Sequence, residues 1–126
     1  MTIILVDKAD SNRDLQLANR TWDCVVTNLG RENVFSPKKI LLLGIGTVGK
    51  LDDADAQIMA DVLKNNLIPK VGDCKYLFLD GNVGDINENA IGYSLDTPYH
   101  LVSNIPKDLL LKLYEFVSAS KGFVVH

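Results

Sequence analysis

The clearest amphipathic segment of the chain begins at Asp52 or Asp53, ends near Pro69, and predicts an α-helix. Its apolar residues recur at spacings of three and four, which places them on one face of a helix. They are Ile58, Met59, Val62, Leu63 and Leu67. The carboxylates at the start suit the positive end of the helix dipole, and Pro69 marks the end. Because such a helix buries its apolar face only against another element, it requires a packed core around it.

Other segments supply the partners of this helix. Helices are predicted from Asn19 or Thr21 to about Leu29, and from about Pro106 to Ser120 with Asn104 as the cap. Strands are predicted at Met1–Asp7, Arg13–Leu17, Ile40–Leu43, Tyr76–Leu79, Ile91–Leu95 and Phe123–Val125. The prediction is a single α+β domain, residues 1–126, with about three helices on a mixed or mostly antiparallel sheet of roughly four to six short strands. Its expected core includes Trp22, Met59, Leu63, Leu110 and Phe116.

The composition is that of an ordinary globular domain. Apolar residues make up 47% of the chain and charged residues 23%, enough for one core without a metal or disulfide. No apolar stretch approaches the roughly 20 residues that span a bilayer, and no signal peptide is recognisable, so a cytoplasmic protein is expected. The only two cysteines, Cys24 and Cys74, are expected to be buried free thiols. With only His100 and His126 as histidines, no zinc site is expected.

Charge is distributed unevenly along the chain. From Tyr76 to Pro106 there are four acids and no Lys or Arg. The acids are Asp80, Asp85, Glu88 and Asp96. A solvated loop region explains such a stretch, and so does an acidic recognition face for a basic protein, with Asp52 and Asp53 as an extension. The chain has no stripe of Lys and Arg, so nucleic-acid binding is not expected.

The glycine-rich stretch Gly44–Lys50 resembles two nucleotide-binding motifs. Gly44, Gly46 and Gly49 fit G-x-G-x-x-G between a predicted strand and a predicted helix. The same stretch nearly matches a phosphate loop, although Leu51 stands where Ser or Thr would bind magnesium. Tyr76–Asp80 then resembles the second motif of such NTPases. Nucleotide binding through this loop and Asp80 is therefore the alternative function, against a purely structural strand-to-helix turn.

Metal and catalytic patterns are incomplete. Asp85–Asn89 has the spacing of a calcium loop, but Ala90 stands at the position that requires Gly. His100 has Asp96, Tyr99 and Ser103 nearby, yet the chain has no G-x-S-x-G elbow. We therefore expect no catalytic residues, no metal and no cofactor.

Three stretches resemble small bacterial immunity proteins of toxin–immunity and contact-dependent inhibition systems. They are Asn19–Trp22 with the helix after it, Leu51–Ala56 opening Ile58–Leu63, and the ending Leu113–Val125. The resemblance implies a non-enzymatic protein that binds and neutralises one cognate toxin. Toxins of such systems are frequently nucleases, which are basic where they hold phosphate, so an acidic surface is the expected complement.

Overall fold

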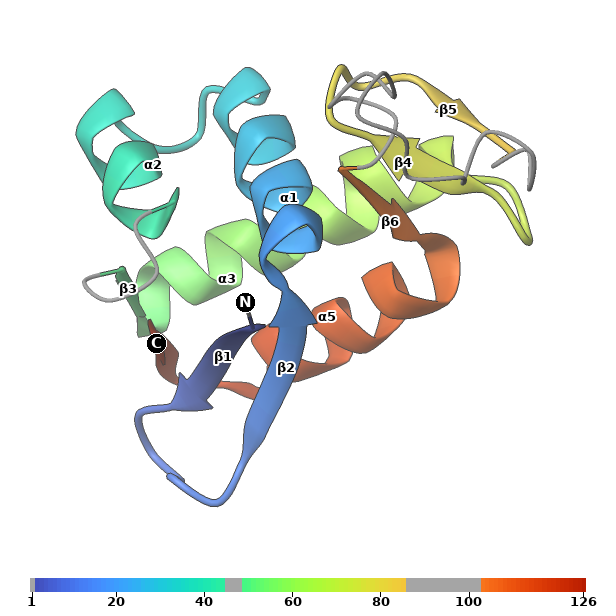
Figure 1. Cartoon of the computed structure of the whole chain (residues 1–126). Helices are drawn as coiled ribbons and strands as arrows, with labels where there is room; N and C mark the ends of the chain where they lie inside the picture. The colour runs from blue at the N-terminus through green and yellow to red at the C-terminus, as the bar shows by residue number, and fades with distance from the viewer. Residues whose placement is uncertain (1, 45–48, 86–102) are drawn as a thin grey trace.

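The computed structural model describes residues 2–44, 49–85 and 103–126 as four α-helices and two antiparallel sheets (Figure 1). The helices are α1 (Asn19–Arg31), α2 (Pro37–Gly44), α3 (Asp53–Val62) and α5 (Lys107–Ala119). Sheet A has the strand order β2 (Asp14–Ala18), β1 (Thr2–Asp7), β7 (Gly122–Val125), β3 (Lys50–Asp52). Sheet B has the order β5 (Val83–Gly84), β4 (Tyr76–Phe78), β6 (Asn104–Pro106). The α+β class and the antiparallel pairing are confirmed, with two sheets and one more helix than predicted.

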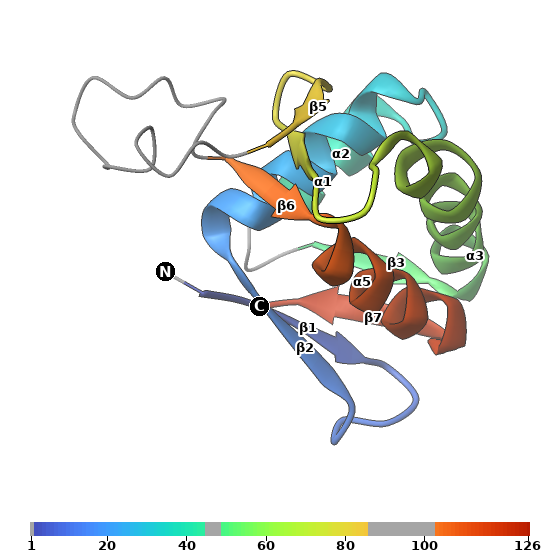
Figure 2. The same cartoon turned by 90° about the vertical axis from the view of Figure 1, so that its right-hand side faces the viewer.

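Sheet A joins the two ends of the chain, and the described helices cover one of its faces. The helices lie on one side of it in Figure 2, and its inner face carries buried Ile3, Leu5 and Leu17. The opposite face presents exposed Asp14 and Gln16 to solvent. An antiparallel sheet tolerates this arrangement because its side chains alternate between the two faces.

The core lies between sheet A, sheet B and the helices. All five residues predicted for it are buried: Trp22, Met59, Leu63, Leu110 and Phe116. The predicted inner face of α3 is wrong at Ile58, which is 39% exposed. Beyond Val62 the chain continues as a π-helical turn, Leu63–Leu67, and a 3₁₀ turn, Ile68–Lys70. The helical segment therefore extends about as far as Pro69, as predicted.

The prediction of a strand at Ile40–Leu43 is wrong, because these residues belong to α2. A run of four apolar residues has no period that separates a strand from a helix. The Ser36 hydroxyl accepts the Lys39 N–H at 3.2 Å, and Pro37 occupies the first helical position. At the other end, the Trp22 indole N–H donates to the Leu43 carbonyl at 2.8 Å. Leu43 is buried, whereas Leu41 is 65% exposed.

Arg13 fastens the β1–β2 hairpin to the end of α5. Its guanidinium pairs with the Asp7 carboxylate at 2.8 Å and donates to the Phe116 carbonyl at 2.8 Å. It also lies 4.7 Å from the centre of the Phe116 ring. Asp7 is on the inner face of β1, where an unpaired carboxylate would be costly. The pair therefore lets a charged residue occupy a core-facing position.

The junction between α5 and β7 requires glycine at position 122. Gly122 has φ of +102°, a conformation that side chains rarely adopt, and a Cβ there would lie 2.7 Å from the Leu51 carbonyl oxygen. The close approach allows β7 to pair with β3 from its first residue.

The two cysteines differ in environment. Cys24 is buried, as predicted, but Cys74 is exposed in the turn before β4 with φ of +63°, so that part of the prediction is wrong. Among the described residues, no helix has both the length and the apolar character to cross a membrane.

Candidate functional site

Asp80 and Asp85 border the β4–β5 hairpin, which is the part of the predicted acidic surface that the structure describes. Both residues are exposed. Asp80 lies in the turn between the strands, where its two carboxylate oxygens accept the backbone N–H and the side-chain amide of Asn82, each at 3.0 Å. Gly81, with φ of +88°, completes the turn. The turn holds this carboxylate at the surface.

Lysines that flank the acidic stretch in sequence form ion pairs near the start of β4. Lys75 Nζ lies 2.8 Å from each carboxylate oxygen of Asp85, and Lys107 Nζ lies 3.3 Å from Asp73. The pairing of Tyr76 with both Gly84 and Pro106 brings these positions together. Asp73, Asp85 and the two ammonium groups thus lie where β4 begins, whereas the third described carboxylate, Asp80, lies in the turn where β4 ends. Within the described residues Asp80 alone of the three makes no ion pair.

The other predicted partner-binding acids are not gathered at this hairpin. Glu88 and Asp96 lie outside the described residues. Asp52 and Asp53 lie where β3 meets α3, at the opposite end of α3 from sheet B (Figure 1). Asp52 caps α3, accepting the Asp55 N–H at 2.8 Å; this bond, with Lys39 and Lys8 nearby, lowers the pKa of Asp52. The structure therefore places Asp52 and Asp53 on a separate surface from Asp80 and Asp85.

Buried polar side chains of α1 hold the acidic hairpin in place. The Asn28 amide donates to the Phe78 carbonyl at 3.1 Å and to the Cys24 carbonyl at 2.8 Å. The Arg31 guanidinium in turn donates to the side-chain oxygen Oδ1 of Asn28 at 3.1 Å. Sequence reasoning missed these residues, although Asn28 follows Cys24 by one helical turn on the buried face. An amide at such a position signals a backbone group that needs a partner.

Cys24 is part of this support and is not a nucleophile. Its thiol lies 3.3 Å from the Leu77 carbonyl oxygen. Burial raises the pKa of the Cys24 thiol to about 12. Because the thiolate is the reactive form, a buried thiol with a raised pKa is inert.

The glycine-rich stretch lacks the context of a nucleotide site in its described residues. Helix α2 precedes it where both motifs require a strand. A Cβ at Gly49 would lie 3.0 Å from the Leu42 carbonyl oxygen, so the backbone of Gly49 lies close against the end of α2. Asp80 belongs to the connections of sheet B, whereas the stretch leads into β3 of sheet A. Residues 45–48 lie outside the described residues.

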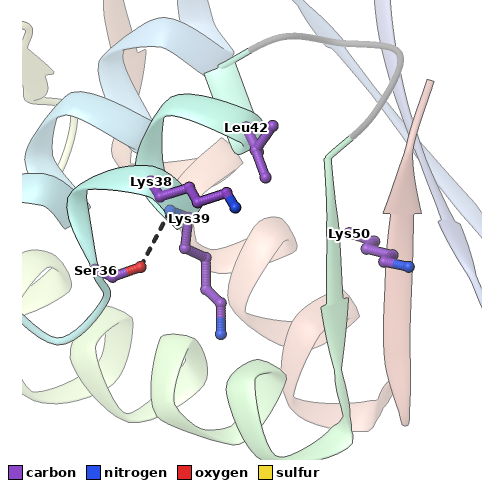
Figure 3. Close-up of a pocket in the computed structure, with 5 residues that line it drawn as sticks. All are labelled: Ser36, Lys38, Lys39, Leu42 and Lys50. Atoms are coloured by element: carbon purple, nitrogen blue, oxygen red, sulfur yellow. Dashed lines mark hydrogen bonds between the residues drawn. The ribbon is translucent and has the colours of Figure 1, made fainter.

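A small pocket of about 210 Å³ lies beside α2 and is lined by Ser36, Lys38, Lys39, Leu42 and Lys50 (Figure 3). Lys39 pairs with Asp55 at 2.6 Å. Figure 3 shows Lys38 extending toward β3, Lys39 turning toward α3, and Lys50 directed away from both. The ammonium groups do not converge on one point. The volume is also below the roughly 300 Å³ at which small-molecule sites begin.

In the described parts of the chain, no group of three or more metal-ligating side chains comes together. Most of the calcium-like stretch and His100 lie outside those parts. No family model matches the chain, and neither a curated protein nor a solved structure matches it.

Proposed function

We propose that this chain is a non-enzymatic inhibitor of the immunity type, which binds a cognate toxin through the acidic hairpin of sheet B. The observation that carries the proposal is the environment of Asp80, an exposed carboxylate that is held in the β4–β5 turn by neutral donors and makes no ion pair with another described residue. A carboxylate presented in this way is available to a cation on a partner.

The proposed partner is a basic protein, such as a nuclease-type toxin. Complementary charge accelerates encounter and discriminates against wrong partners. The Lys75–Asp85 pair does not conflict with this role, because Asp85 is largely exposed, Lys75 is partly exposed, and such surface pairs contribute little to stability. Asp85 can therefore exchange Lys75 for a cation of the partner at small cost.

The test uses the product of the adjacent gene, which in a toxin–immunity pair is the toxin. The first readout is whether this chain suppresses its toxicity when the two are co-expressed. The second is the association rate of the purified proteins at low and at physiological salt, for the wild type and for Asp80→Lys with Asp85→Lys. We expect the double reversal to slow association and to lose much of its salt dependence, because charges at an interface rim act on encounter.

Asp53→Lys is the matched control. It reverses an exposed carboxylate at the other end of α3 and should leave association unchanged. If the double reversal binds with unchanged rate and salt slope, the acidic hairpin is only a solvated turn. If Asp53→Lys alone slows binding, the recognition surface lies beside β3 instead. Nucleotide binding at Gly44–Lys50 stays a prediction that no contact of the described residues favours.

A further inference from the structure

Strand β2 forms an edge of sheet A, and the hydrogen bonds of β1 show which of its residues face outward. The Asp7 N–H donates to the Arg13 carbonyl at 3.0 Å, while Ile4 exchanges bonds of 3.1 and 2.8 Å with His126. Backbone groups of successive residues in a strand point to opposite sides. On β1, therefore, Ile3, Leu5 and Asp7 face β2, and Ile4 faces β7.

The register between β1 and β2 shows which backbone groups of β2 face β1 and which face outward. Leu15 lies opposite Leu5 and Leu17 opposite Ile3, so both leucines bond to β1. Asp14, Gln16 and Ala18 consequently direct their N–H groups away from the sheet. Within the described residues, no hydrogen bond joins these three N–H groups to another group of the chain.

An uncovered edge strand is a template for another strand, and proteins usually protect it with Lys, Pro or a β-bulge. The sequence of β2, Asp14-Leu15-Gln16-Leu17-Ala18, contains neither Lys nor Pro. Its pairing with β1 runs without a bulge from Thr2–Ala18 to Val6–Asp14. Lys, Pro and a bulge are therefore absent from this strand, and Asp14 is its only charged residue.

We propose that two copies of this chain associate through their β2 strands, antiparallel to each other, around a two-fold axis at Gln16. In this register Gln16 lies opposite Gln16 of the second copy, and Asp14 lies opposite Ala18. The Gln16 N–H groups bond to each other's carbonyls, and each Ala18 N–H bonds to the Asp14 carbonyl of the other copy. No two carboxylates face each other, so the register is compatible in charge.

The proposed pairing closes on itself and uses the same residues of both copies, as a two-fold contact requires. It joins two four-stranded sheets into one sheet of twice that width. Half-buried Leu15, at the margin of the core, would lie beside Leu17 of the second copy. The interface concerns sheet A and not the acidic hairpin of sheet B, so it stands or falls independently of the proposed function.

Sedimentation of the full chain from low micromolar to the highest attainable concentration tests the pairing. The wild type should shift toward the mass of two chains. Gln16→Lys and Gln16→Glu each place like charges opposite each other, and each should weaken association about five- to tenfold. An equimolar mixture of the two variants should restore association, because opposite charges then meet across the axis.

Asn65→Lys is the control, since it makes a similar change at an exposed position of the helical segment Leu63–Leu67 and should leave association unchanged. A wild type that stays monomeric at every concentration would overturn the proposal. Association that survives in both Gln16 variants, or a mixture that fails to restore it, would overturn the two-fold register. Circular dichroism shows that each variant is folded before its mass is interpreted.

Discussion

Sheets A and B both carry carboxylates, but the two regions use them differently. Beside sheet A, Asp7 accepts the Ala9 N–H at 2.9 Å and the Arg13 guanidinium at 2.8 Å, and Asp52 caps α3. Beside sheet B, Asp80 bonds only within its own turn, and the 70% exposed side chain of Asp85 pairs with the partly exposed Lys75. Residue type alone does not distinguish a structural carboxylate from one free to meet a partner; its donors and its burial do.

The two sheets also differ in how they are attached. Sheet A combines the chain's two ends and buries an apolar face against the helices. Sheet B is short, and hydrogen bonds from Asn28 and Cys24 fix its central strand β4 to α1. Leu77 of β4 and Ile105 of β6 are fully buried. Substitutions of buried residues should therefore cost more unfolding free energy than substitutions of exposed residues at either sheet.

The largest effect is expected from Leu63→Ala, which sets the scale for a residue that is purely structural. Leu63 is fully buried at the start of the π-helical turn, and its truncation should cost about 2–5 kcal/mol of unfolding free energy. Urea denaturation measures this cost, with Ile58→Ala on the exposed side of α3 as the milder control. A loss below about 0.5 kcal/mol would remove Leu63 from the core.

Asp7→Asn should have the next largest effect, because it tests whether a carboxylate of sheet A belongs to the fold. The substitution keeps the shape but removes the charge that pairs with Arg13, and should cost about 1–3 kcal/mol. Asp61→Asn, at an exposed position of α3, is the matched control and should be near neutral. Equal costs for the two variants would contradict the structural role of Asp7.

The pH dependence of stability should reveal the same role. Burial alone would raise the pKa of Asp7, but the Ala9 N–H and the Arg13 guanidinium outweigh it and hold the pKa below its usual value. Since the folded chain binds this proton less readily, the stabilisation is complete above the unfolded pKa of about 3.9 and is lost as pH falls through the folded pKa.

The measurement is the unfolding free energy of the wild type minus that of Asp7→Asn across a pH series. This difference should be constant from about pH 7 to about pH 5 and should narrow below about pH 4. Asp52 has a lowered pKa in both proteins, so its contribution cancels in the difference. A difference that does not change with pH would show that Asp7 is not the titrating group.

The sequence predicts the fold well where a period or a cap is present. The spacing of Met59 and Leu63 locates α3, and Asp52 caps it as predicted. At Ile40–Leu43 the apolar run is too short to show a period, and the decisive signal was Ser36-Pro37, a typical start of a helix. Asn104 was expected to cap α5 but pairs in β6, because tertiary pairing with β4 overrides a local preference.

The candidate site is less predictable than the fold. The order of charged residues along the chain does not show which of them lie close together in the structure. The acidic stretch contains no Lys or Arg, yet Lys75 and Lys107 reach its side of sheet B once the strands pair. In the same way Asp52 and Asp80 read as one acidic surface in sequence, while α3 separates them in the structure. Only the strand register and the direction of the helix show which of these charged residues are neighbours.

The smallest effect is expected from Asp80→Ala, which tests whether the carboxylate of the acidic hairpin is dispensable for the fold. The side chain is exposed and its bonds to Asn82 lie within one turn, so the loss should stay within about 0.5 kcal/mol. Asp52→Ala is the matched comparison, because it removes a carboxylate that is also exposed but caps α3. It should lower the melting temperature more than Asp80→Ala does. Equal melting temperatures for the two variants would mean that capping does not separate the two regions. A clear loss of stability in Asp80→Ala would place this carboxylate among the structural ones, and the proposed recognition surface would then lose its central residue.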